Sequence, residues 1–214
     1  SDFPVRKACF THIEDRIDCA DYDRSKILIT VHPHKRDVWF WTIPFSDGRC
    51  SIGVVGEPAS LSEGEAEDIL KTAVSQVPHL SKLLASATWD TPVNSIMGYS
   101  SKVSTLSGDG FCLLGNAGEF LDPVFSSGVT IAMQSARLAA PCIERSLNGE
   151  TLDWQTEYED ALLQGVNTFK TYVQGWYDFR FQDVIFKANR NERITSMISS
   201  VLAGYAWDKE NPFV

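Results

Sequence analysis

The order in which two kinds of hydrophobic pattern follow one another constrains the fold of this chain most. In residues 37–43, Val38 and Phe40 alternate with Trp39 and Trp41, and after residue 127 apolar residues recur at every third or fourth position instead. A period of two is typical of strands and a period near 3.6 of helices. The order of the expected elements is strands, a helix, further extended chain and then helices, without alternating β–α units. This order predicts an α+β fold rather than a doubly wound parallel sheet.

The first part of the chain predicts an antiparallel sheet with one helix. Residues 26–31, 37–43 and 50–55 have strand composition, and Asp47-Gly48 between the last two is a hairpin turn signal. Ser62 and Glu65 have the spacing of a capping box, which predicts a helix from there to the break at Pro78. Residues 88–104 are expected to be extended.

The last part predicts three helices. The first begins near Ser127 and ends at Asn148-Gly149. The second and third cover residues 158–176 and 192–203, each with an apolar stripe that is expected to be core. The stripe of the second helix comprises Tyr158, Leu162, Val166, Phe169, Val173 and Trp176.

Charge and composition exclude several classes of partner. The formal net charge is −9 and no Lys/Arg cluster occurs, so no nucleic acid partner is expected. No apolar run reaches the roughly 18 residues that a membrane span needs, and no signal segment is present. Five scattered cysteines without CxxC spacing indicate reduced thiols in a cytoplasmic protein. His32 and His34 are interpreted as a loop pair, so no metal site is expected.

Residues 113–128 carry the strongest chemical signal. An apolar strand ends in a turn where Gly115 lets a ligand approach the backbone. Asn116 offers a polar group at the strand end, and Asp122 is pushed toward extended geometry by the proline after it. Ser127-Gly128 then begins a helix, whose first N–H groups favour an anionic or polarised group. A tight turn capped by serines, without any ligand, fits the same residues equally well.

A resemblance to a known family distinguishes these two interpretations. The segment is similar to the second FAD-binding motif, "GD…DP", of flavoproteins that resemble para-hydroxybenzoate hydroxylase. Its ending, residues 122–129 (DPVFSSGV), looks most like flavin-dependent halogenases that act on phenolic and pyrrolic substrates. In the tryptophan-specific branch an acidic residue precedes the Ser-Thr-Gly turn. Phe125 stands there in this chain, which argues against tryptophan as the substrate.

The resemblance assigns cofactor roles to Gly115, Asn116, Asp122, Pro123, Ser127, Gly128 and Val129. Asn116 replaces the family's aspartate, which binds the ribityl chain of FAD; the change keeps an acceptor and removes a charge. Asp122 and Pro123 are expected beside the isoalloxazine ring. The backbone N–H groups of residues 127–129 are expected to face its pyrimidine edge. In halogenases the same turn binds chloride or bromide, which implies Ser127 and Gly128 here.

A second motif strengthens the resemblance. Residues 39–44 (WFWTIP) match the WxWxIP signature of flavin-dependent halogenases. The resemblance implies that Trp39, Trp41, Ile43 and Pro44 form an apolar wall between flavin and substrate. The alternation alone supports only a plainer interpretation, in which the two tryptophans and Ile43 are the buried face of a sheet.

The resemblance also implies a division of the chain into three parts. Residues 1–105 would form a substrate-side antiparallel sheet with a packed helix, incomplete at its N-terminus. Residues 106–149 would be the C-terminal portion of an FAD-binding domain, and residues 150–214 a C-terminal helical region. Because no GxGxxG occurs, we expect the rest of the FAD site, and the catalytic lysine of halogenases, to lie outside this chain.

The implied activity is halogenation of a small aromatic substrate through flavin hydroperoxide. The substrate would be a phenol or pyrrole, tethered to a carrier protein in some members, and a separate flavin reductase would supply reduced FAD. Two alternatives stay open. In the first, the protein is a non-halogenating flavin monooxygenase or dehydrogenase. In the second, the isolated chain is a non-catalytic module that forms a homodimer.

Overall fold

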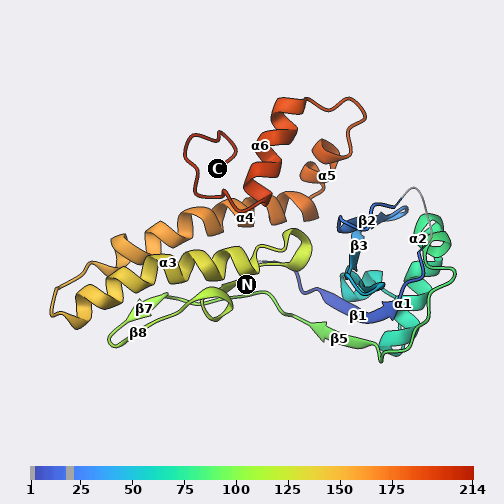
Figure 1. Ribbon diagram of the computed structural model, residues 1–214, viewed down its shortest axis with the longest axis horizontal. Helices are drawn as coiled ribbons and strands as arrows, with labels where there is room; N and C mark the ends of the chain where they lie inside the picture. The colour runs from blue at the N-terminus through green and yellow to red at the C-terminus, as the bar shows by residue number, and fades with distance from the viewer. Residues whose placement is uncertain (1–2, 18–21) are drawn as a thin grey trace. The chain divides into compact units, whose positions relative to one another are not determined.

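The computed structural model describes residues 3–17 and 22–214, which group into two compact units. We call Pro4–Tyr99 the sheet unit and Ser100–Val214, which also takes in Phe3, the helical unit (Figure 1). Strands and helices are both abundant, and the α+β prediction is confirmed. The separate boundary at residue 149 stays a prediction. No helix among the described residues is both long and apolar enough to cross a membrane.

The sheet unit holds a five-stranded antiparallel sheet in its described residues, in the order β2-β3-β4-β1-β5. Its strands are β1 (Lys7–Glu14), β2 (Leu28–His32), β3 (Lys35–Pro44), β4 (Arg49–Gly56) and β5 (Asn94–Met97). Helices α1 (Ala66–Ser75) and α2 (Pro78–Leu83) follow β4. The predicted hairpin joins β3 to β4, where Gly48 takes a φ of 83° that a glycine adopts without strain.

The core of the sheet unit lies between one face of the sheet and the two helices. Val38 and Phe40 of β3 belong to this core, whereas the alternating residues Trp39, Trp41 and Ile43 occupy the opposite face. The face named in the plainer interpretation is therefore not the one that the helices cover. Trp39 is nevertheless fully buried, and Trp41 and Ile43 are half-buried.

Helix α1 begins later than the sequence predicts. Its first residue is Ala66, after Glu65, and no side chain caps its N-terminus, so the capping box at Ser62 does not form. The backbone reason is Gly64, whose φ of 125° lies outside helical geometry and keeps Ser62 out of the helix. The predicted apolar stripe is correct, because Ile69, Leu70, Ala73 and Val74 are all buried.

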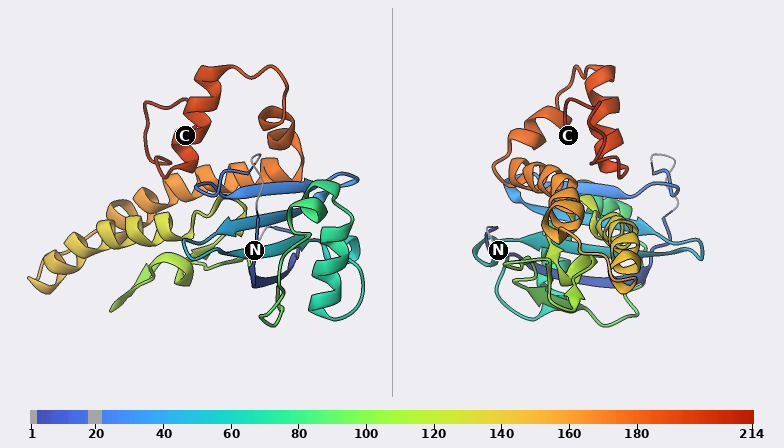
Figure 2. Two further views of the ribbon diagram at one scale, coloured as in Figure 1. Left: turned by 45° about the vertical axis from the view of Figure 1, so that its right-hand side comes forward. Right: turned by 90° about the vertical axis from the view of Figure 1, so that its left-hand side faces the viewer.

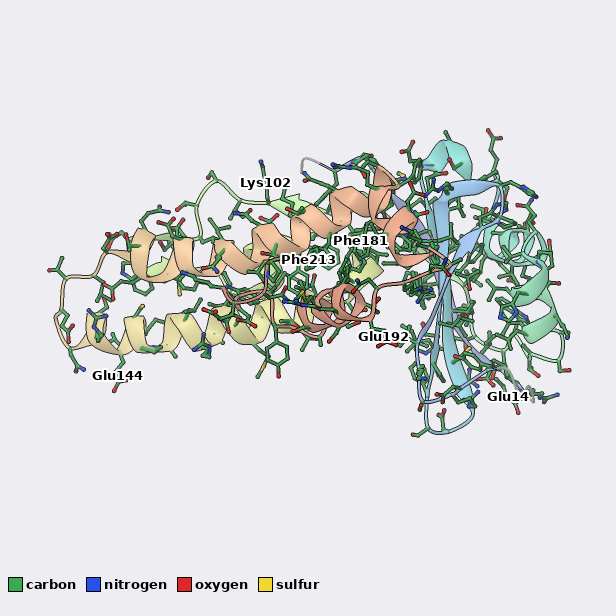
Figure 3. The ribbon with its side chains drawn as sticks, turned by 90° about the horizontal axis from the view of Figure 1, so that it is seen from above. Glu14, Lys102, Glu144, Phe181, Glu192 and Phe213 are labelled. Carbon is green, nitrogen blue, oxygen red and sulfur yellow. The ribbon has the colours of Figure 1, made fainter. Side chains whose placement is uncertain are left out.

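The helical unit contains two long helices that lie side by side (Figures 1 and 2). Seen from above, they run alongside each other, with Glu144 near the end of the first (Figure 3). They are α3 (Gly128–Leu147) and α4 (Ala161–Tyr177), with a π-helical turn, η4 (Gln155–Asp160), before α4. Two short helices follow, α5 (Arg180–Ile185) and α6 (Glu192–Leu202). The six residues of the predicted second-helix stripe are all buried.

Short strands and 3-10 turns precede α3 in this unit. Strand β6 (Ser101–Lys102) pairs with β9 (Glu119–Phe120), and β7 (Ser107–Gly108) pairs with β8 (Phe111–Cys112). The 3-10 turns are η2 (Gly115–Ala117) and η3 (Pro123–Phe125). The chain thus makes a hairpin, a glycine turn and a second turn before the long helix begins.

The π-helical turn η4 holds the start of this segment. The Tyr158 hydroxyl donates to the carbonyl of Leu113, and the Glu159 carboxylate accepts from the Ser107 amide at 2.8 Å and the Thr105 hydroxyl at 3.0 Å. Single π-helical turns are rare and frequently occur at functional sites. This one presents two consecutive side chains to the segment that leads into the glycine turn.

Glu159 should make the stability of the helical unit depend on pH. Burial works to raise the pKa of Glu159, but the hydrogen bonds from Ser107, the Leu106 backbone and Thr105 outweigh it and lower the pKa below 4.5. A carboxyl whose pKa is lower in the folded state than in the unfolded state stabilises the fold at pH values above its unfolded-state pKa. This stabilisation is lost as the pH falls through the folded-state pKa. Glu159→Gln should therefore reduce the free energy of unfolding by about 1–3 kcal/mol at pH 7. Urea unfolding should show this difference shrinking in acid, and a constant difference at every pH would contradict the assignment.

Candidate functional site

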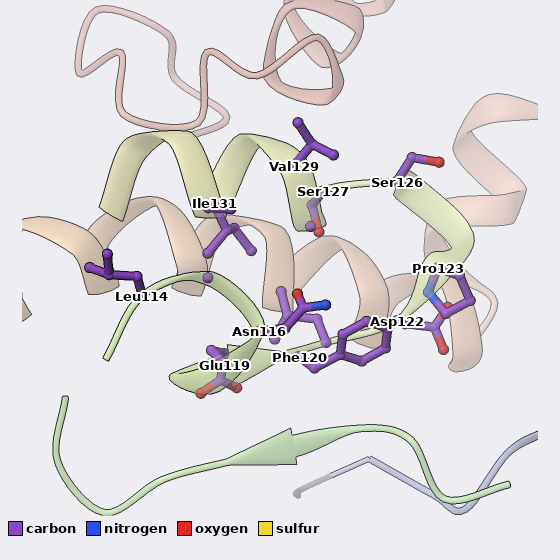
Figure 4. Close-up of a pocket in the computed structure, with 14 residues that line it drawn as sticks. Leu114, Asn116, Glu119, Phe120, Asp122, Pro123, Ser126, Ser127, Val129 and Ile131 are labelled. Atoms are coloured by element: carbon purple, nitrogen blue, oxygen red, sulfur yellow. The ribbon is translucent and has the colours of Figure 1, made fainter. Parts of the chain in front are cut away.

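A cavity of about 770 Å³ lies in the helical unit, between the two 3-10 turns, β9 and the start of α3 (Figure 4). All seven residues with expected cofactor roles line it, so the structure brings them together in one place. The full lining is Leu114, Gly115, Asn116, Glu119, Phe120, Leu121, Asp122, Pro123, Ser126, Ser127, Gly128, Val129, Ile131 and Ala132.

The glycine turn approaches α3 so closely that only glycine fits at its first position. Gly115 has a φ of 51°, and a Cβ added there would lie 2.9 Å from the Cβ of Ala132. Its amide donates to the Ser135 hydroxyl at 2.9 Å. A residue with a side chain would be strained in this conformation and would also collide with the helix.

Asp122 is buried, and both of its carboxylate oxygens accept hydrogen bonds from protein groups. One oxygen accepts from the Val124 amide at 2.9 Å, which caps η3, and the other accepts from the Tyr177 hydroxyl at 2.8 Å. One of the two sequence interpretations was a turn capped by serines. Ser127 makes no side-chain capping hydrogen bond at the start of α3, so that interpretation is wrong for Ser127, and the side-chain cap in this segment is Asp122 at η3.

Ser126 connects η3 to α3 in a left-handed conformation, with φ 52° and ψ 32°. This conformation costs an L-residue about 1–2 kcal/mol. Strain of this kind persists only when the surroundings enforce it, and it gathers at ligand sites. The backbone reverses here so that the first turn of α3 faces the cavity.

The start of α3 can favour negative charge or an electron-rich edge. Helix geometry leaves the first-turn amides, those of Gly128 and Val129 among them, without an acceptor four residues earlier. The aligned peptide dipoles add a partial positive charge at the same end. Figure 4 shows the side chains of Asn116 and Ser127 pointing toward one another, while Val129 points away. A Cβ on Gly128 would lie 3.5 Å from the Asn116 side-chain oxygen, so the two residues are close.

Seven lining residues were not among the predicted site residues: Leu114, Glu119, Phe120, Leu121, Ser126, Ile131 and Ala132. Glu119 and Phe120 line the cavity because β9 pairs with β6, with Lys102 opposite Glu119. A two-residue strand leaves no periodic signal in a sequence. Tyr177, which bonds Asp122 from a distance of 55 residues, likewise had no signal that marked it.

The other expected site residues all lie on β3 of the sheet unit. The Trp41 ring lies against Gly53 of β4, its indole N–H donates to the Ser51 hydroxyl at 3.0 Å, and its ring centroid is 5.9 Å from that of Trp39. Ile43 and Pro44 continue the strand opposite Ser51 and Cys50. Trp39, Trp41 and Ile43 share one face of β3, whereas Pro44, the last residue of the strand, belongs by alternation to the other face, and the role of the four as a wall stays a prediction.

The family model described as tryptophan halogenase matches residues 29–210. The chain belongs to the tryptophan halogenase family. Among curated members, a 1H-pyrrole-2-carbonyl-[peptidyl-carrier protein] chlorinase of Pseudomonas fluorescens is 29% identical over 147 residues, which are 67% of this chain and 31% of the chlorinase. A tryptophan 2-halogenase of Chondromyces crocatus is 35% identical over 133 residues, 59% of this chain and 26% of that protein.

Two solved structures are similar to nearly the whole chain. A flavoprotein/dehydrogenase from Cytophaga hutchinsonii is 40% identical with a TM-score of 0.93, covering 100% of this chain and 52% of that one. The flavin-dependent brominase Bmp2 is 25% identical with a TM-score of 0.81, covering 97% and 52%. The chain therefore spans about a third or less of the curated members above and about half of the solved chains.

The contact between Trp41 and Gly53 gives a test of the β3 strip. A Cβ on Gly53 would lie 2.2 Å from the Trp41 ring, so Gly53→Ala should displace the indole and reduce the free energy of unfolding by about 1–3 kcal/mol. Urea unfolding followed by tryptophan fluorescence measures both effects. In a Trp41→Leu background the same alanine should cost much less, and an equal cost in both backgrounds would mean that the indole does not contact Gly53.

Proposed function

We propose that the full-length protein is an FAD-dependent halogenase that acts on a phenolic or pyrrolic ring. The observation that carries this is the single cavity that gathers Gly115, Asn116, Asp122 and the start of α3. Membership of the halogenase family supports the same activity. The WxWxIP strip on β3 supports it independently, because its residues belong to a different part of the chain.

The residues present fit part of a flavin. A glycine that no side chain can replace allows a ring or chain to approach the turn, and Asn116 offers an amide for a ribityl hydroxyl. The first-turn amides of α3 would face the polar edge of the flavin, where negative charge develops on reduction. When bound, reduced FAD would activate molecular oxygen, and oxygen is the two-electron oxidant that converts a halide into an electrophilic halogen. We propose that the adenosine end binds to residues outside this chain.

Phe125 supports a substrate other than tryptophan. Its ring packs edge-on against three other aromatic rings, those of Tyr172, Trp176 and Phe181. An acidic side chain at this position would be surrounded by these rings, where burying an unpaired charge is unfavourable.

Two relatives act on pyrrole carried by a peptidyl-carrier protein, which supports a carrier-tethered substrate here. We place the protein in the cytoplasm with a separate flavin reductase, in keeping with the free thiols among its described cysteines.

Asn116 allows the cofactor part of the proposal to be measured directly. Asn116 is exposed, so its replacement should leave folding unchanged. Asn116→Ala should raise the Kd for FAD about fivefold by removing one hydrogen bond, whereas Asn116→Asp, which restores the usual family residue, should stay within about twofold. Flavin fluorescence titration of the full-length protein gives these values. Equal affinity in all three proteins would place the ribityl chain elsewhere.

Product analysis distinguishes the halogenase from the alternative oxidoreductase. The full-length protein, a flavin reductase, FAD, oxygen and bromide or chloride should convert a phenol or a carrier-tethered pyrrole to a product with the halogen isotope pattern. A hydroxylated or dehydrogenated product without halogen would instead support the alternative. The 40% identical Cytophaga hutchinsonii protein, described as a flavoprotein/dehydrogenase, is the specific observation in favour of that alternative.

The outer face of α3 supports a proposal about protein contacts. Val129, Met133 and Leu147 lie along one side of this helix and are 76%, 71% and 83% exposed. A continuous apolar strip on a helix is typical of a contact surface. We propose that the rest of the full-length protein covers it, and that the isolated chain forms a homodimer through it.

Light scattering should show Met133→Glu shifting the isolated chain to monomer, with Glu144→Gln on the same helix as a control. A monomeric wild-type chain would contradict the dimer.

A further inference from the structure

We propose that Tyr177, the last residue of α4, is a positioning residue for the candidate flavin site. It would act through Asp122 to hold the Ser126 turn, by which we mean residues 122–127, in the shape that aims α3 at the cavity. The inference rests on the proposed function, to which it adds a residue from outside the two motifs.

The Ser126 turn needs an external restraint. A serine at φ 52° occupies a region that residues other than glycine, asparagine and aspartate rarely adopt. Within the turn, the Ser126 amide donates to the Pro123 carbonyl at 3.0 Å. This bond and the one from the Val124 amide to the Asp122 carboxylate are both local, and they do not explain why the chain accepts this conformation rather than relaxing to an extended one.

One restraint acts on the turn at its first residue. The Asp122 carboxylate is 5% exposed, and the Tyr177 hydroxyl donates to its second oxygen at 2.8 Å. The first oxygen is held by the Val124 amide, inside the turn itself. Tyr177 therefore supplies a link between the turn and α4 that the turn does not provide for itself. A buried carboxylate that loses such a donor is left poorly solvated and seeks another partner.

A second restraint acts on the residue before Ser126. The Phe125 ring meets Tyr172, Trp176 and Phe181 at centroid distances of 6.2, 5.9 and 5.4 Å, in each case close to perpendicular. Edge-to-face contacts of this kind are favourable for aromatic pairs. The turn is thus held by α4 and α5 through an apolar contact at Phe125 and a polar contact at Asp122.

Tyr172 provides a matched control for the polar contact. It lies on the same helix and its ring contacts Phe125, but its hydroxyl is buried without a hydrogen-bond partner among the described residues. Tyr172→Phe and Tyr177→Phe remove the same atom from neighbouring positions. Only the second should release Asp122.

The experiment measures the turn and the cofactor separately in the full-length protein. Hydrogen exchange without flavin should show the amides of residues 124–128 exchanging about fivefold faster in Tyr177→Phe, and at the wild-type rate in Tyr172→Phe. The Kd for FAD should rise about fivefold in Tyr177→Phe and stay within about twofold in Tyr172→Phe. In an Asp122→Ala background, Tyr177→Phe should have no further effect on the Kd, because the two residues act as one unit.

Each other outcome has a definite meaning. Equal exchange in the two variants, or equal loosening of α4 and the turn, would overturn the proposal by reducing Tyr177 to a general stabilising role. Additive effects of Asp122→Ala and Tyr177→Phe on the Kd would overturn it too. If the wild-type protein binds no FAD, the proposed function fails, and the restraint by Tyr177 stands or falls by the exchange rates alone.

Discussion

The close approach of the Gly115 turn to α3 determines the shape of the cavity. The two backbones meet with no space for a methyl group, and the Gly115 amide bonds Ser135 one helical turn beyond Ala132. This contact places the end of the apolar segment beside the start of α3, although twelve residues separate Gly115 from Ser127 in the chain. Small residues are required on both sides of this contact, where Gly115 meets Ala132 and Ser135 of α3.

The second long helix stabilises the same segment at further points. Glu159 accepts a hydrogen bond from Ser107, Tyr158 donates one to Leu113 and Tyr177 donates one to Asp122, while the Ser135 hydroxyl of α3 accepts one from Gly115. The first three contacts come from η4 and α4, and they occur at intervals along residues 107–122. The segment has little regular secondary structure of its own, so side chains of the helices satisfy its polar groups. A cofactor site formed by turns can be rigid only when its neighbours are ordered in this way.

The sequence predicted those features that depend on neighbouring residues. Strands β2, β3 and β4, the apolar stripes of α1 and α4 and the limits of α3 follow from periodicity and from turn residues such as Asp47-Gly48 and Asn148-Gly149, whereas β1 was not predicted. The seven predicted cofactor residues were predicted together because they belong to one continuous segment, residues 115–129. The core-facing side of β3 was not predictable, since both of its faces are apolar and alternation cannot say which one the helices cover. The predicted start of α1 was wrong because the capping-box pattern carries no information about the backbone conformation of Gly64. Tyr177 was missed because its partner lies 55 residues away and only the tertiary fold unites them.

The charges around the cavity discriminate between the two roles proposed for the amides of Ser127 and Gly128. A helix N-terminus stabilises an anion by about 0.3–1 kcal/mol when the site is exposed to solvent. The chain carries a net charge of −9, and the Asp122 carboxylate lines the same cavity, so both oppose the entry of a halide ion. The amides alone would therefore bind a free halide weakly. The edge of a flavin ring meets no such opposition before it is reduced, and the amides would act on the negative charge that develops afterwards. Within this chain the flavin edge is accordingly the better supported partner of the two amides, and halide binding would need additional positive charge from the rest of the protein.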